Sequence, residues 1–280
     1  MLCAAMRVFC ARLLRRKMNT PLKKFSIRHF VPRSNSFGRA LAVAFLLMTS
    51  GLAPDAKAGD AWKEKKYQDW TADDVYRIKY ESPWTRRAVK DAPWIKGRVG
   101  FLSMAPTGCD GRPDLSRANQ NPPEMAMGAT VASVEYRVDW MSSRTMRAAK
   151  MREAILCGTM EQESADEFLD QEVEQYQIDV KSADMMPFDS MDDETIQKNT
   201  WLTFKKTQIK INPEYVGAMR MSGQKRIFSI TFKFNKQSED GKDYVLPDEK
   251  EIEFMMQADK FVLKAKFQPS KMVTKEGPDL

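Results

Sequence analysis

The sequence predicts an α+β protein: an antiparallel sheet with a C-terminal meander, and several short helices packed on one face. Hydrophobic and polar residues alternate over residues 131–140, and again in three runs after residue 227, which is the period of a half-buried strand. Segments between these runs begin with Thr, Ser or Asp and end near Gly or Pro, as short helices do. Polar turns separate the last three runs, so we expect antiparallel neighbours with one solvated face.

The first 58 residues have the composition of a secretion signal. A basic leader precedes the apolar run 40–53, and the sequence Ala56-Lys57-Ala58 before Gly59 matches a small-residue cleavage site. The run is shorter than the roughly 18 residues of a membrane-spanning helix. We therefore expect cleavage after Ala58, a periplasmic or extracellular location, and contact with the membrane only during export.

Two alternatives concern this N-terminal segment. Translation starting at Met18 would leave residues 1–17 out of the protein. An uncleaved segment that keeps residues 40–53 would make the protein membrane-anchored.

Cleavage changes the charge of the protein. The chain has 45 Lys and Arg against 38 Asp and Glu; residues 1–58 hold 11 and one of these, so residues 59–280 keep 34 and 37, a net charge of −3. We expect no nucleic-acid partner, because such a partner needs basic residues on the folded domain. His29, the sole histidine, also lies in the signal. The mature part thus lacks the base of Ser-His-Asp and Cys-His sites and the imidazole ligand of most zinc sites.

Residues 59–280 are long enough for a single domain. Near its start, Thr71 precedes two acids and predicts the N-cap of a helix that Pro83 ends. Residues 104–129 are rich in Gly, Pro and Asn without a period, and they predict a loop or linker.

Four further elements are predicted between the strand at 131–140 and the C-terminal strands. They are a helix from Ser142-Ser143 to Gly158, an acidic helix over 162–174, a short strand over 176–180 and a helix from Ser190–Asp193 to Asn199. The C-terminal strands are predicted around Phe228–Phe234, Ile252–Met256 and Phe261–Phe267.

Two cysteines, Cys109 and Cys157, remain after cleavage. A disulfide between them is expected in an oxidising compartment, and it would close a loop of 48 residues. Two free thiols are the alternative. A catalytic thiol is disfavoured, because no histidine is present to act as its base.

Four tryptophans lie close together in the opening segment: Trp62, Trp70, Trp84 and Trp94. They could form an aromatic platform for sugars or peptides. Large side chains of this kind more often pack an element onto a sheet, and we favour packing.

Acidic residues offer two further hypotheses. Asp189, Asp192, Asp193 and Glu194 form a cluster of the kind that binds calcium, but the EF-hand spacing is absent and acids are common in the first turn of a helix. We expect no metal and no cofactor. A pair of carboxylates could hydrolyse a glycan without histidine, although the sequence does not select the pair. The acids at Glu161, Glu163, Asp166 and Glu167 fit a solvated helix face.

Two segments near the ends of the mature chain have distinctive sequences. Residues 70–84 run from Trp70 through an acidic helix to Ser-Pro-Trp84, and residues 261–277 contain Lys-Ala-Lys-Phe at 264–267. Together they resemble a group of secreted bacterial proteins that are common in acidobacteria. The group has no assigned function, so the resemblance implies export and a domain that joins both ends. The Cys109–Cys157 pair and Pro278 depart from its pattern.

These observations favour an exported, non-catalytic binding or envelope-associated structural module, with a glycan or another cell-envelope component as its contact. A carboxylate-dependent glycan hydrolase is the main alternative.

We predict that the exported protein starts at Gly59. Intact-mass measurement, with thiols alkylated before and after reduction, checks this start and the state of the two cysteines together. A mass that includes residues 40–53, or two alkylated thiols without reduction, would contradict the prediction.

Overall fold

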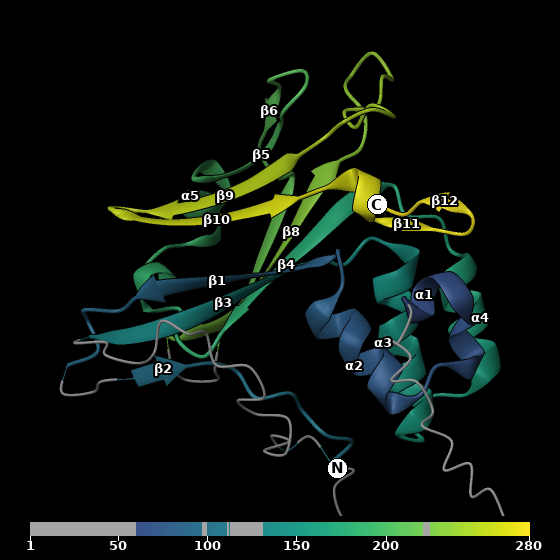
Figure 1. The fold of residues 1–280 in the computed structure, drawn as a ribbon. Helices are drawn as coiled ribbons and strands as arrows, with labels where there is room; N and C mark the ends of the chain where they lie inside the picture. The colour runs from purple at the N-terminus through teal and green to yellow at the C-terminus, as the bar shows by residue number, and fades with distance from the viewer. Residues whose placement is uncertain (1–59, 97–99, 111, 113–130, 221–224) are drawn as a thin grey trace, which may run out of the picture. The chain divides into compact units, whose positions relative to one another are not determined.

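The computed structural model describes residues 60–96, 100–110, 112, 131–220 and 225–280, which belong to one compact unit spanning residues 53–280. Two antiparallel sheets and a group of helices make up this part of the chain (Figure 1). The predicted cleavage site at Ala56, Ala58 and Gly59 lies outside the described residues, as does most of the predicted loop 104–129.

The first sheet has the strand order β1-β3-β4-β8-β7, with all these neighbours antiparallel. Its strands are β1 (Thr85–Asp91), β3 (Ala132–Trp140), β4 (Gln175–Ser182), β8 (Ile227–Asn235) and β7 (Tyr215–Arg220). A short strand, β2 (Gly100–Leu102), pairs in parallel with the beginning of β3.

The second sheet has the order β10-β9-β5-β6. Its strands are β10 (Phe261–Phe267), β9 (Ile252–Ala258), β5 (Thr200–Phe204) and β6 (Lys210–Ile211). A small hairpin of β11 (Val273–Thr274) and β12 (Gly277–Pro278) follows the 3-10 turn η4 (Pro269–Lys271).

Aromatic side chains join the inner faces of the two sheets. Three ring pairs take one member from each sheet: Tyr136–Phe261 at 5.3 Å, Trp140–Phe267 at 5.1 Å and Phe232–Phe254 at 5.4 Å between centroids. All except Phe261 are fully buried. Tilted and edge-on pairs of this kind add to the free energy of burying apolar area.

The α+β class is confirmed, and the alternation over 131–140 is confirmed as β3. The single C-terminal meander is wrong. The predicted strands at 228–234 and 252–256 belong to different sheets, because β8 pairs with β4 and β7 whereas β9 pairs with β10 and β5. Alternation identifies a strand with one buried face. Because both sheets bury one face against the same core, alternation cannot assign a strand to one sheet or the other.

The helices do not share one face of a sheet. In Figure 1, α1 (Ala61–Glu64), α2 (Ala72–Glu81), α3 (Arg144–Leu156) and α4 (Gln162–Asp170) gather near the β11–β12 hairpin, with the 3-10 turn η1 (Tyr67–Asp69) among them. In contrast, α5 (Asp193–Lys198) packs on β5, β7 and β9, and η3 (Met186–Phe188) precedes it. Several short helices were predicted on one face; four of them gather together, and α5 and η3 lie elsewhere.

The predicted helix starts agree with the caps except at α5. Thr71 forms a capping box with Asp74 at the start of α2, and the Ser143 hydroxyl accepts a hydrogen bond from Met146 N at 3.1 Å at the start of α3. The N-cap of α5 is Asp192 rather than Ser190, because its carboxylate accepts from Thr195 N at 2.8 Å.

Charged residues on the outer face of the first sheet are partly covered by α2. Arg137 donates to Asp139 at 3.0 Å, and its guanidinium lies 4.4 Å from the ring centroid of Tyr80 on α2. Asp139, whose side chain is 2% exposed, also accepts from the Thr85 hydroxyl at 3.1 Å. Burial works against the charge on Arg137, but Asp139 and Tyr80 outweigh it and raise the pKa of Arg137. Because the side chains of Arg137 and Asp139 are only 14% and 2% exposed, this face is less solvated than the alternation predicts.

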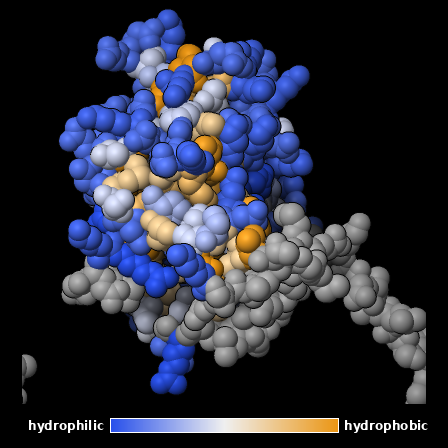
Figure 2. All heavy atoms as spheres, turned by 90° about the vertical axis from the view of Figure 1, so that its left-hand side faces the viewer, coloured by the Kyte–Doolittle hydropathy of each residue, from blue (hydrophilic) through white to orange (hydrophobic). Residues whose placement is uncertain are grey.

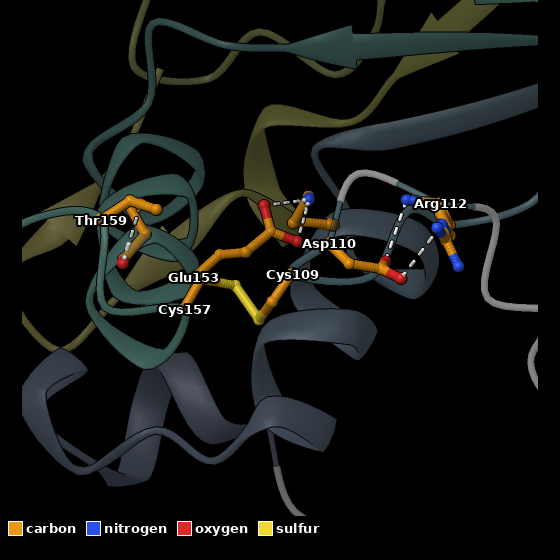
Figure 3. Close-up of a disulfide and its surroundings, with 8 residues drawn as sticks. Cys109, Asp110, Arg112, Glu153, Cys157 and Thr159 are labelled. Atoms are coloured by element: carbon orange, nitrogen blue, oxygen red, sulfur yellow. Dashed lines mark hydrogen bonds and ion pairs between the residues drawn. A yellow bond between two sulfur atoms is a disulfide. The ribbon is translucent and has the colours of Figure 1, made fainter. Parts of the chain in front are cut away.

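The predicted Cys109–Cys157 pair is brought together at the end of α3. The two sulfurs lie 2.02 Å apart, and the Cα atoms are 5.1 Å apart (Figure 3). Gly158, with φ of 66°, ends the helix in a Schellman motif, in which Thr159 N donates to Ala154 O at 2.9 Å and Gly158 N to Ile155 O at 2.9 Å. The bridge therefore ties the segment after β2 to a fixed helix end.

We predict that the double variant Cys109→Ser, Cys157→Ser lowers the free energy of unfolding by about 2–4 kcal/mol, because a bridge across 48 residues removes loop-closure entropy from the unfolded chain. Urea denaturation of the oxidised, reduced and variant proteins measures this. Reduced wild type should match the variant. Equal midpoints for oxidised and reduced wild type would show that the bridge does not stabilise the fold.

Candidate functional site

Two hollows among the described residues share Trp62 in their lining. One, which we call the Tyr67 pocket, has a volume of about 810 Å³ and is lined by α1, η1, the start of α3 and the β11–β12 hairpin. The other, the Arg86 pocket, has about 620 Å³ and is lined by the junction of α2 with β1 and by residues 266–271. Trp62 lines both pockets, and we refer to the two together as the Trp62 surface.

Trp62 is held in place by its contact with a fully buried neighbour. Its ring meets Trp84 edge to face, with centroids 5.6 Å apart and planes at 86°. The indole N–H of Trp84 donates to Asp279 O at 2.6 Å. Trp62, which forms the wall between the two pockets, is therefore held by Trp84 just before β1 and, through Trp84, by the C-terminal segment.

Asp279 also caps the longest helix near the site. Its carboxylate accepts from Arg144 N at 2.6 Å and from Thr145 N at 2.9 Å, the first two amides of α3. A carboxylate at this position satisfies free helix N–H groups and interacts favourably with the helix dipole. Asp279 therefore fixes the β11–β12 side of the Tyr67 pocket to the α3 side.

The Tyr67 pocket contains a hydrogen-bonded group of three side chains. The Tyr67 hydroxyl donates to the Asp166 carboxylate, and the Gln162 amide donates both to the Tyr67 oxygen and, at 3.1 Å, to Asp166. Burial, with the neighbouring carboxylate, raises the pKa of Tyr67 to about 12. The hydrogen bond from Tyr67 lowers the pKa of Asp166. At neutral pH Tyr67 is therefore neutral and Asp166 ionised, so neither is tuned to exchange a proton near pH 7.

The charges around the Tyr67 pocket are balanced. Four cations (Lys65, Lys66, Arg144 and Lys275) and four acids (Glu64, Asp166, Glu276 and Asp279) line it. Lys65 pairs with Asp74 at 2.8 Å, and Asp166 and Asp279 are held by the contacts above. This arrangement can bind polar groups through hydrogen bonds, but its two constrained carboxylates already have structural partners.

The four tryptophans of the opening segment are not arranged as one exposed platform. Trp70 and Trp84 are buried in the core, and the Trp70 indole donates to Ala61 O at 3.3 Å. Trp94 is partly exposed and packs edge-on against Phe261, at 5.8 Å between centroids. Of the four, Trp62 and Trp70 line the Tyr67 pocket, and Trp62 alone also lines the Arg86 pocket.

The acids proposed as a calcium cluster each have another partner in the structure. Asp192 caps α5, Asp189 accepts from Ile227 N at 2.7 Å, Glu194 pairs with Lys198 at 2.6 Å and Asp193 with Arg220 at 3.8 Å. In the part of the chain that the structure describes, no group of three or more His, Cys, Asp or Glu side chains is placed to hold a metal ion.

Two further surface features are a small hollow and a hydrophobic area. A hollow of about 210 Å³ beside the disulfide is lined mainly by α2 and by residues 106–109. The face drawn in Figure 2 shows hydrophobic side chains in a central area bordered by hydrophilic ones. Large hydrophobic residues with substantial exposure in the chain include Met186, Tyr215 and Met219, at 42%, 53% and 58%.

Comparison with models of known protein families, with curated proteins and with solved structures finds no match. The site is therefore interpreted from its own geometry. Among the described residues, no helix has the length and hydropathy required to cross a membrane.

Sequence reasoning missed most of the residues that shape the Trp62 surface. Tyr67, Arg86, Lys271 and Asp279 come from segments far apart in the chain, and no spacing marks them as neighbours. Asp166, predicted on a solvated helix face, is partly exposed there, and its hydrogen bond from Tyr67 was not predicted. No local pattern marks Asp279 as the cap of α3, because it lies 135 residues from Arg144 in the chain.

We predict that Tyr67→Phe raises the pKa of Asp166 toward the ordinary value near 3.9. The wild-type pKa is depressed, so this carboxylate stabilises the fold above the unfolded-state pKa and loses that contribution as pH falls through its folded-state pKa. Carboxyl-carbon NMR titration of Asp166 measures the change. Tyr215→Phe, at an exposed tyrosine on β7, is the control, and an unchanged Asp166 titration in Tyr67→Phe would refute the contact.

Proposed function

We propose that this protein is an exported, non-catalytic binding module that holds a cell-envelope or extracellular glycan on the Trp62 surface. The observation that carries the proposal is the position of Trp62 as the shared wall of two polar pockets. Pockets that combine an aromatic wall with a few fixed polar groups are the usual form of small-ligand sites.

The make-up of the surface favours a sugar-like ligand. An indole ring supplies apolar area, while hydroxyl, amide and ammonium groups around it supply hydrogen bonds: those of Tyr67, Gln68, Ser270, Gln268 and Lys271. The Trp62 N–H is buried and has no hydrogen-bond partner among the described residues. The N–H is therefore closed to a ligand in either pocket, and only the rest of the partly exposed indole is available for contact.

The states of the nearby acids favour binding over hydrolysis. Glycoside hydrolysis needs one carboxylic acid that stays protonated near neutral pH and a second carboxylate across the scissile bond. In the Tyr67 pocket the pKa of Asp166 is lowered, and Asp279 is occupied by the amides of α3. The hydrolase alternative therefore has less support from this surface.

Export is part of the proposal. The apolar run 40–53 and the Ala56-Lys57-Ala58 site support a cleaved signal. The Cys109–Cys157 pair at bonding distance is compatible with an oxidising compartment.

We predict that a neutral or acidic oligosaccharide raises the melting temperature of the protein in a panel that also contains peptides and divalent cations. Trp62→Ala should weaken that binding at least tenfold, about 1.4 kcal/mol, because it removes the wall of both pockets. Trp62→Phe keeps a ring against Trp84 and should bind with intermediate affinity. Isothermal titration calorimetry of the three proteins measures the affinities.

The control is Trp201→Ala. Trp201 lies on β5, is also partly exposed, and has Lys210 Nζ 3.4 Å from its ring centroid. It lines neither pocket, so binding should be unchanged. Absence of any oligosaccharide shift, or equal binding by Trp62→Ala, would contradict the proposal. Release of new reducing ends would favour the hydrolase instead.

A further inference from the structure

Arg86 is a fixed cation without an acidic partner. It lies near the start of β1, where its Nε donates to Lys266 O at 2.7 Å on β10 and its Nη1 to Thr85 O at 2.8 Å. The guanidinium carbon is 5.5 Å from the ring centroid of Phe267. No carboxylate of the described residues lies within 4.0 Å of it, so its charge is held by carbonyl oxygens and an aromatic face.

Such an arrangement leaves part of the guanidinium free for a ligand. The hydrogen bonds that Arg86 forms with described residues use Nε and Nη1, and Nη2 forms none with them. Burial lowers the pKa of Arg86, which is the sign of a charge that has lost water without gaining a counter-ion. Arg86 lines the Arg86 pocket, so an anion in that pocket could supply the missing charge.

Other cations of the pocket add to the positive potential. Lys63, Lys266 and Lys271 line it together with two acids, Asp60 and Glu81. Lys63 pairs with Asp60 at 2.8 Å, and Lys266 pairs with Glu251 at 3.0 Å. Lys271 is exposed and forms no ion pair with a described carboxylate. Arg86 and Lys271 are therefore the two cations whose charge is available to a ligand.

We propose that the Arg86 pocket binds the anionic group of an acidic saccharide, a carboxylate or a sulfate on a sugar ring that lies against Trp62. This assignment rests on the proposed function, because it names the ligand class of the same surface. Guanidinium groups recognise planar and tetrahedral oxyanions through paired N–H donors. Ser270 and Gln268 line the same pocket and can bond sugar hydroxyls.

The saccharide is favoured over a larger polyanion by the distribution of charge. Residues 59–280 carry a net charge of −3, so a long nucleic acid or an anionic membrane would be repelled away from the pocket. In the Arg86 pocket two cations without an ion pair among the described residues, Arg86 and Lys271, face one such acid, Glu81, so an excess of positive charge remains there, whereas the neighbouring Tyr67 pocket is balanced in charge. A ligand with one or a few anionic groups and several hydroxyls fits both.

Calorimetry with defined probes tests the proposal on the exported, disulfide-bonded protein. The probes are an oligogalacturonate, its fully methyl-esterified form, a sulfated oligosaccharide, a neutral oligosaccharide and inorganic sulfate. We expect oligogalacturonate or the sulfated sugar to bind at least tenfold more tightly than the neutral forms. Raising NaCl from 50 to 500 mM should weaken that binding several-fold. Whichever of the two anionic sugars binds more tightly identifies the anionic group.

Substitutions distinguish the loss of a charged contact with the ligand from a loss of folding. Lys271→Glu should weaken binding of the acidic sugar at least tenfold, and Arg86→Lys should weaken it also, because the ammonium lacks the guanidinium fork. Lys150→Glu is the matched control: it makes the same charge change at an exposed position on α3 that lines neither pocket. Lys271 keeps the test valid if Arg86 variants fail to fold, since Lys271 is exposed.

The outcomes distinguish the two proposals. Equal affinity for the free and esterified sugars, or unchanged binding by Lys271→Glu, would overturn the anionic ligand class. If Trp62→Ala still abolished binding in that case, the proposed function would stand. Inorganic sulfate binding as tightly as the sugars would reduce the pocket to a simple anion site and overturn the saccharide assignment. No binding of any saccharide would remove both proposals.

Discussion

The contacts of Asp279 are the constraint on which the rest of the functional surface depends. Its carboxylate caps α3 through Arg144 N and Thr145 N, and its carbonyl accepts from the Trp84 indole. One residue therefore joins the longest helix, the turn just before β1 and the end of the β11–β12 hairpin. Trp62 stands on Trp84, so the wall between the two pockets takes its position from the same junction. Without these contacts of Asp279, the wall that Trp62 forms in both pockets would lose its support.

The fold illustrates which parts of a β architecture follow from local pattern. Caps and periodicity located α2, α3, β3 and the β9–β10 hairpin, because these depend on residues within one turn or one strand. The pairing of the strands could not be predicted from local patterns. β8 and β9 have the same alternation, yet one pairs with β4 and the other with β5, across sixteen residues of connection. That choice is made by which aromatic rings meet across the core, such as Phe232 with Phe254, and no local pattern encodes it.

The candidate site was predictable only at its centre. The tryptophan-rich opening segment includes Trp62, but it also includes Trp70 and Trp84, which are buried in the core. Composition cannot separate these roles, because an indole serves packing and recognition equally well. The charged residues of the site could not be predicted from the sequence for a different reason. Arg86 and Lys271 are 185 residues apart, and they become neighbours only because β1 and β10 meet at the edges of the two sheets. The disulfide was easier to predict, since residues 59–280 hold a single pair of cysteines.

The placement of the surface has an energetic consequence for ligand binding. Its walls come from the opening helices, from β1, from α3 and from the last residues of the described chain, so a ligand contacts segments that are separate in the unfolded protein. A ligand that binds only the native state stabilises the whole unit by RT ln(1 + [L]/Kd). An anion at Arg86 would add a further contribution, because it compensates a charge that folding removes from water without pairing. Binding and folding stability are therefore linked through the same residues. A site of this kind can tolerate an uncompensated arginine because the two sheets hold Arg86 by its carbonyl contacts before any ligand arrives.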